Sequence, residues 1–184
     1  MRSRHFSLVD YLVFAVLAAS GLAIKTVVVP LAQMITGPLL IPGGVVAGGF
    51  YMLFLVLASA ITGKRGAALV VSLLQAVLVT ITGTLGSHGA ASLFTYSLSG
   101  LAVEIWLLIS GHRGCCTLCC FGAGLAANVA GSLAVNLALF RLPPVPLLLS
   151  LSAAAFSGGL GGLVAHLAAR SIKRSGILRS AGGF

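Results

Sequence analysis

Carboxylate side chains are almost absent from this sequence: Asp10 and Glu104 are its only acidic residues among 184, beside 11 lysines and arginines. A water-facing surface needs many charges of both signs, and this chain cannot supply them. Apolar residues make up 59% of the chain, and its mean hydropathy is +1.14. The composition therefore excludes a soluble globular protein and predicts an all-α, polytopic membrane protein.

Catalytic motifs are missing as well. The sequence contains no glycine-rich phosphate-binding loop, no His-Glu-x-x-His pair for zinc, and no serine or cysteine triad pattern. We therefore expect no enzymatic activity, cofactor or metal, and any ATP hydrolysis would belong to partner subunits. The chain also has no internal repeat, which argues against transporters built from inverted halves.

Basic residues lie in alternate gaps between the apolar runs. Lys25 and Arg141 fall on one side, and the other nine fall on the opposite side. Those nine are Arg2, Arg4, Lys64, Arg65, Arg113, Arg170, Lys173, Arg174 and Arg179. Because lysine and arginine accumulate on the cytoplasmic side of bilayer proteins, this split predicts cytoplasmic N- and C-termini in a plasma membrane. The net charge of +9 is dispersed over span ends, where it meets lipid headgroups, so nucleic acid is not an expected partner.

Six apolar runs predict six transmembrane helices in a single domain over residues 1–184, with a flexible basic tail from about residue 170. The predicted helices cover residues 8–29, 45–61, 67–82, 92–109, 116–139 and 147–169. The breakers Pro30 and Pro42 predict an irregular outer segment between the first two helices. Glycine-rich stretches at 122–131 and 158–162 predict close approach between helix backbones.

Glu104 lies deep inside the fourth predicted helix. A charge at that depth costs about 2.5–3.5 kcal/mol, so the carboxyl group needs a partner, a cavity or a proton. Two interpretations stay open: a structural hydrogen bond to a neighbouring helix, or a contact with a bound ligand.

Several amide and phenol side chains also occupy the predicted spans. They are Asn128 and Asn136 in the fifth helix, Gln75 in the third and Tyr96 in the fourth, with Gln33 in the outer segment. Buried amides need hydrogen-bond partners that lipid does not supply. Bonds between helices would satisfy them, and so would a polar cavity that opens outward and holds a small solute. On the second interpretation these five residues bind the solute, and Glu104 closes the floor of the cavity.

Four cysteines, Cys115, Cys116, Cys119 and Cys120, begin the fifth helix. They occupy one arc of the helix, so they cannot surround a tetrahedral zinc ion unaided. Because this end faces the reducing cytoplasm, we expect all four to remain thiols.

Two short stretches resemble a known transporter family: Gly63-Lys-Arg-Gly-Ala-Ala-Leu69 and Gly100-Leu-Ala-Val-Glu104. They are similar to the "kpGAAL" and "GlgaE" stretches in the YkoE-like branch of S components. S components are the substrate-binding subunits of energy-coupling-factor (ECF) vitamin importers. The similarity is detailed over residues 40–110 and extends to the remainder in outline. It implies a high-affinity membrane subunit for a micronutrient, with thiamine or its hydroxymethylpyrimidine precursor as the substrates associated with this branch.

The resemblance also implies partners. Ala15 and Ala19 match the alanine-x-x-x-alanine docking motif of the family, so this face would meet the coupling transmembrane subunit, while two ATPase subunits supply energy. Residues 25–42 would form a lid over a pocket between the fourth, fifth and sixth helices. One departure concerns the third helix, where Ser72, Gln75 and Val79 replace acidic residues of the branch. A cationic thiazolium would lose its counter-charges there, which makes a neutral, more apolar solute an equal alternative.

Two other function classes remain open at the level of sequence. A self-contained secondary carrier or small efflux protein would use Glu104 to bind protons. A membrane scaffold or assembly protein would bind no solute at all.

Overall fold

The computed structural model describes the whole chain apart from residues 1–5, 40, 84–90, 112–113, 115 and 176–184. Six α-helices follow one another as predicted. They are α1 (Leu8–Thr36), α2 (Gly43–Thr62), α3 (Ala67–Thr82), α4 (Ala91–Ile109), α5 (Thr117–Val135) and α6 (Pro144–Ser175). A 3-10 turn (η1, Gly37–Leu39) follows α1, and a π-helical turn (η2, Asn136–Phe140) extends α5.

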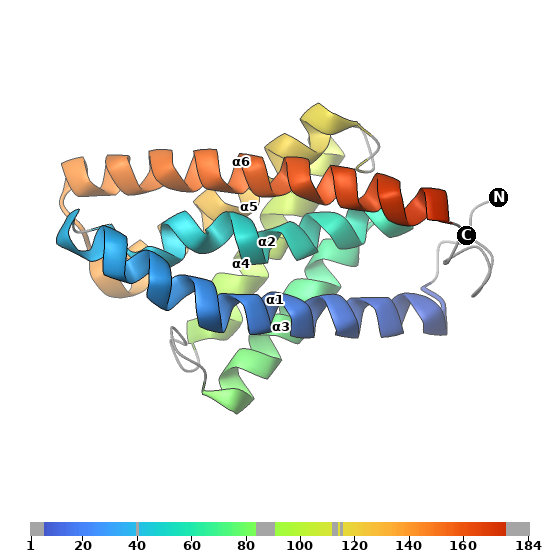
Figure 1. Cartoon of the computed structure of the whole chain (residues 1–184), viewed down its shortest axis with the longest axis horizontal. Helices are drawn as coiled ribbons and strands as arrows, with labels where there is room; N and C mark the ends of the chain where they lie inside the picture. Colours follow the sequence, from blue (N-terminus) through green and yellow to red (C-terminus); the bar gives the residue numbers. More distant parts are fainter. Residues whose placement is uncertain (1–5, 40, 84–90, 112–113, 115, 176–184) are drawn as a thin grey trace.

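The central helix of the bundle is α2. It packs against each of the other five α-helices and runs between α1 and α6 in Figure 1. From Phe54 to Thr62 every residue of its second half is buried. A helix that is apolar all round is stable only when other helices surround it, which explains its place in the centre.

Five of these helices are long and apolar enough to cross a membrane, and α3 is shorter, with 16 residues. Large apolar side chains are exposed along the outer helices, among them Leu12 at 61%, Phe94 at 63% and Leu167 at 63%. Such a surface suits lipid rather than water. The predicted all-α, polytopic membrane architecture is confirmed.

Two helix boundaries differ from the prediction. α1 continues through Pro30 to Thr36, although proline has no N–H to donate to the helix ladder. Gly37 adopts right-handed helical angles and prolongs the turn instead of ending it. α6 likewise continues to Ser175, so residues 170–175 are helical and do not belong to a tail. The predicted tail beyond residue 175, the loop at 84–89 and Arg113 lie outside the described residues.

The glycine-rich stretches are packing surfaces inside the bundle. A Cβ atom added to Gly124 in α5 would lie 2.8 Å from the backbone nitrogen of Gly162 in α6. A Cβ atom on Gly161 of α6 would lie 2.9 Å from the Cα atom of Gly49 in α2. Glycine is required here because the helix backbones themselves touch, which confirms the predicted close approach of α5 and α6.

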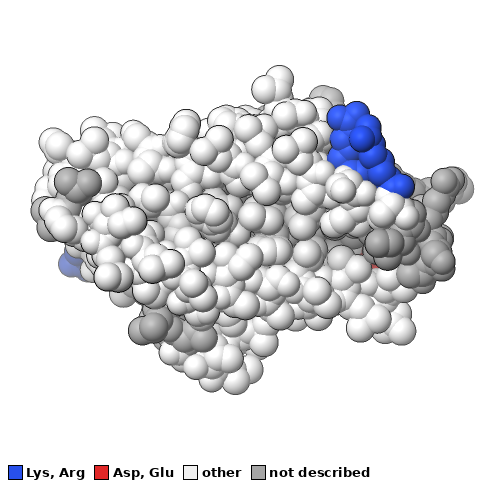
Figure 2. All heavy atoms as spheres, viewed as in Figure 1, with Lys and Arg blue, Asp and Glu red and all other residues white. Residues whose placement is uncertain are grey.

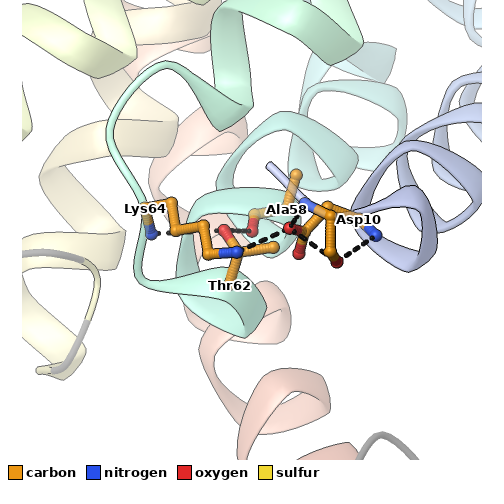
Figure 3. A network of polar contacts seen from close by, with 5 residues as sticks. Asp10, Ala58, Thr62 and Lys64 are labelled. Atoms are coloured by element: carbon orange, nitrogen blue, oxygen red, sulfur yellow. Dashed lines mark hydrogen bonds and ion pairs between the residues drawn. The ribbon is translucent and has the colours of Figure 1, made fainter. Parts of the chain in front are cut away.

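The start of α1 and the end of α6 lie at one end of the bundle in Figure 1, which we call the basic end because it carries Lys64, Arg170, Lys173 and Arg174. The last three are exposed on α6, and Figure 2 shows basic side chains gathered there. Lys64, in the turn after α2, makes an ion pair of 2.6 Å with Asp10 near the start of α1 (Figure 3). Asp10 also accepts the backbone N–H of Ser7 at 2.6 Å and so caps α1.

Candidate functional site

The structure contains a cavity of about 310 Å³, and the helix segments that line it lie opposite the basic end in Figure 1. Its wall comes from the second half of α1, the first half of α2, the start of α4, the end of α5 with η2, and the start of α6. The polar side chains in the wall are Lys25, Gln33, Tyr51, Thr95, Tyr96, Ser99, Asn128, Ser132, Asn136 and Ser150. The predicted pocket between α4, α5 and α6 therefore also has walls from α1 and α2. Most of the segment expected to be a lid, residues 25–36, is helix α1.

Lys25 is the residue of this site that sequence reasoning missed. It is only 5% exposed, and its ammonium group donates a hydrogen bond of 2.6 Å to the hydroxyl of Tyr96. The same nitrogen lies 5.0 Å from the ring centre of Tyr96 and 6.0 Å from that of Tyr51, within the range of cation–π attraction. Because α1 continues past Lys25, the lysine belongs to the wall of the cavity. A lysine inside an apolar helix was the signal for it.

Gln33 belongs to the wall of the cavity, but it lies in α1 and not in an irregular outer segment. Its side-chain oxygen accepts the backbone N–H of Gly43 at 2.5 Å. Gly43 is the first residue of α2, whose N-cap Pro42 provides no side-chain hydrogen bond. Gln33 therefore satisfies one of the free N–H groups of this helix start and ties the end of α1 to α2.

Asn128 lies in the wall, and it also joins three helices. Its amide nitrogen donates to the carbonyl oxygen of Val45 in α2 and to that of Ala154 in α6, both at 2.9 Å. An asparagine amide has two N–H donors, so both are used within the protein. Its side-chain oxygen lies against Gly48 in α2, where an added Cβ atom would meet it.

Asn136 lies at the junction of α5 and η2. Its side-chain oxygen accepts the backbone N–H of Leu142 at 2.9 Å, while its backbone oxygen accepts that of Arg141 at 2.8 Å. These bonds close the chain into the turn before α6. π-helical turns such as η2 often occur at functional sites.

Ser150 in α6 adds a polar atom that the sequence did not indicate. Its side chain lines the cavity and is 3% exposed, and its hydroxyl has no hydrogen-bond partner among the described residues. A buried polar group in that condition is costly unless a ligand or water binds it.

Gln75 and Glu104 were expected to contact the solute, and both lie outside the cavity wall. Gln75 is buried beside Gly21 and Phe54 between α3, α1 and α2, and its amide atoms have no partner among the described residues. Glu104 accepts the backbone N–H of Ala68 at 3.0 Å, in the first turn of α3. Glu104 therefore does not form the floor of the cavity as predicted, because its carboxylate faces the start of the neighbouring helix α3.

Ala15 and Ala19 are exposed on α1, whereas Ala18 between them is buried. The small residues of the expected docking motif thus lie on the outer surface and do not pack inside the bundle.

The cysteines differ from the expectation of four thiols. Cys116 and Cys119 form a disulfide, and Cys120 is a buried thiol whose sulfur lies 3.8 Å from Nδ1 of His166. One turn of helix brings Cys116 and Cys119 together, so the bond closes a very short loop. Cys115 lies outside the described residues. Those residues hold no group of three or more His, Cys, Asp or Glu side chains that could bind a metal ion.

The comparisons with known proteins agree on a transporter family. Residues 9–130, about two thirds of the chain, match the family described as "ABC-type cobalt transport system, permease component". The structure matches that of a protein described as an S-component of an ECF transporter, with a TM-score of 0.76. That match has 20% sequence identity and covers 96% of this chain and 90% of the other. No curated protein matches the sequence. The chain thus belongs to the family of ABC-type cobalt transport system permease components, and it has the fold of an ECF-transporter S component.

Proposed function

We propose that this protein is the high-affinity substrate-binding membrane subunit of an ECF-type importer and captures a small organic micronutrient in the cavity described above. The observation that carries the proposal is the cavity itself. It combines a fixed lysine, three amides and several hydroxyl groups with an apolar wall, at the end of the bundle farthest from the basic end. Small-molecule sites are typically such apolar clefts with a few fixed polar groups, and their volumes begin at about 300 Å³.

The described wall suits an organic solute better than a metal ion. It contains no histidine, cysteine, aspartate or glutamate, and its one charged side chain is Lys25. A hydrated cobalt ion would meet a positive charge and no strong ligand. The same charge disfavours the cationic thiazolium of thiamine, so hydroxymethylpyrimidine or another uncharged or anionic solute fits this wall better.

Energy for transport would come from partners. We propose that the exposed face of α1 at Ala15 and Ala19 docks on a coupling transmembrane subunit, and that two ATPase subunits complete the importer. The exposure of both alanines supports a docking role, because small side chains on an outer surface allow another helix to approach closely.

Purified protein reconstituted alone tests this function. Native mass spectrometry should find a small molecule bound to it. Proteoliposomes that contain only this chain should bind that molecule without accumulating it against a gradient. Accumulation driven by a proton gradient in the lone protein would contradict the proposal and favour a secondary carrier. No described contact favours that carrier, since Glu104 is bonded to α3 outside the cavity wall.

A further inference from the structure

The charge of the cavity wall is of one sign, positive. Lys25 is the only charged side chain among the described residues that line it. Both acidic residues of the chain are engaged elsewhere, Asp10 with Lys64 at 2.6 Å and Glu104 with the backbone of Ala68 at 3.0 Å. A solute in the cavity therefore meets a positive potential that no carboxylate of the wall offsets.

The start of α2 adds to this potential. Pro42, Gly44 and Val45 line the cavity, and they belong to the N-cap and first turn of the helix. The N-terminus of a helix carries a partial positive charge of about half an elementary charge and attracts anions. Lys25 and the start of α2 thus act on the same space with the same sign.

The ammonium group of Lys25 is held in a defined place. The Tyr96 hydroxyl accepts one of its hydrogen bonds, and the rings of Tyr96 and Tyr51 lie beside it. A lysine held in a low-dielectric wall interacts more strongly with an opposite charge than a lysine in water does. It also avoids most of the ordering cost that a flexible lysine would incur on binding.

The remainder of the wall indicates which chemical groups the rest of the solute carries. Most of it is apolar, and Val29, Met52, Val135, Phe140 and Leu151 are examples. Ser150 provides a buried hydroxyl without a protein partner among the described residues. The volume of 310 Å³ equals about ten water molecules at roughly 30 Å³ each, which suits a small solute.

Resting on the proposed function, we infer that the solute is a small carboxylic acid with an apolar body. Its carboxylate binds the ammonium group of Lys25 beside Tyr96, and its body packs against the apolar wall. A polar group on that body accepts or donates a hydrogen bond at Ser150. The selectivity of the protein therefore depends on the negative charge of its solute.

Matched acids and amides test the role of charge. Two pairs fit the cavity in size, octanoate with octanamide and 4-phenylbutyrate with 4-phenylbutyramide. Binding to the detergent-solubilised protein is measured by calorimetry, and native mass spectrometry identifies any co-purified molecule. We expect each acid to bind more tightly than its amide, and the co-purified molecule to be a small carboxylic acid.

Three variants locate the effect. Lys25→Met should weaken acid binding about 10- to 150-fold, the range of a lost hydrogen bond to a charged group, and leave amide binding within about threefold. Lys25→Arg keeps the charge and should retain part of the preference for acids. Arg141→Asn removes the other cation at this end, which does not line the cavity, and should leave the preference unchanged. Asparagine tolerates the left-handed φ of 47° at this position.

The possible results separate this inference from the proposed function. Equal binding of acids and amides, together with a co-purified solute that is uncharged or cationic, would overturn the inference and leave the proposed function intact. A preference for acids that survives in a folded Lys25→Met protein would also overturn it. If mass spectrometry identified the co-purified molecule as an anionic phospholipid, the inference that the solute is a small acid would be overturned. Absence of any bound molecule and of any binding would overturn both.

Discussion

Glu104 on α4 and Ala68 on α3 are joined by a hydrogen bond of 3.0 Å between a side-chain oxygen and a backbone N–H. Ala68 is the second residue of α3, whose N-cap Gly66 has no side chain to bond the free N–H groups. A carboxylate at this position completes the helix start and benefits from its positive dipole. The buried charge of Glu104 is thus accounted for by helix capping.

Glu104→Gln should keep solute binding and transport, because the amide oxygen can still accept the N–H of Ala68. Glu104→Ala leaves that buried N–H unsatisfied and should destabilise the protein by about 1–3 kcal/mol. Thermal unfolding in detergent, with uptake by the complete importer, measures both effects. Loss of transport in a folded Glu104→Gln protein would instead assign the proton-binding role to this residue.

The pair of Asp10 and Lys64 should stabilise the basic end of the bundle. Asp10 is fully buried, so Lys64→Met leaves a buried carboxylate without its ion-pair partner and should cost about 3–5 kcal/mol. The double variant with Asp10→Asn should cost less than the single Lys64→Met change, because the uncompensated charge is gone. Denaturation of the unmodified protein, the two single variants and the double variant gives the coupling energy of the pair. Additive effects of the two substitutions would show that the pair contributes nothing.

Gly124→Ala should separate α5 from α6. The added methyl group would overlap the backbone of Gly158 and Gly162, and overpacking of this kind costs about 1–3 kcal/mol. Gly37→Ala is the matched control, because its Cβ atom would meet only the end of the Gln33 side chain, at 3.3 Å, in right-handed helical backbone. We expect a lower melting temperature for Gly124→Ala alone. Equal melting temperatures would contradict the close contact of the two backbones.

Docking through α1 should depend on the small size of Ala15 and Ala19. Replacing both with tryptophan should abolish assembly with the coupling subunit and uptake, while the isolated protein still binds its solute. The control carries tryptophan at Val164 and Leu167, which are 53% and 63% exposed on α6. Co-purification of the subunits and uptake assays measure both proteins. Normal assembly of the Ala15 and Ala19 variant would place the docking surface elsewhere.

The orientation in the membrane follows from the basic end. In a protein whose four cysteines are replaced by alanine, single cysteines are introduced at Val145 and Ser175, at the two ends of α6. A membrane-impermeant maleimide applied to intact cells should label position 145 and leave position 175 unlabelled until the cells are opened. Labelling of both positions, or of 175 alone, would contradict the predicted cytoplasmic termini.

Most of the fold could be predicted from the sequence, because each span is a continuous apolar run and the basic residues mark its ends. The place of Lys25 in the cavity wall was missed because the sequence put it near the outer end of the first helix, whereas α1 continues to Thr36. The bonding of Glu104 and Asn128 depends on which helices touch, and one sequence contains little information on that. The sequence indicated Tyr96 and Asn136, which both line the cavity, because polar groups in a membrane span need hydrogen-bond partners or a polar cavity.

Direct backbone contacts join α6 to α2 and to α5. Where glycines touch directly, no side chain can rotate to widen the gap, so these three helices act as one body. The second half of α1 is held to α2 by the Gln33 bond to Gly43 and to α4 by the Lys25 bond to Tyr96. A lysine ammonium group has three N–H donors, so Lys25 can keep its bond to Tyr96 while it binds a solute. On the proposed function, a solute held between Lys25 of α1 and Ser150 of α6 would therefore be a further link between α1 and the three glycine-packed helices.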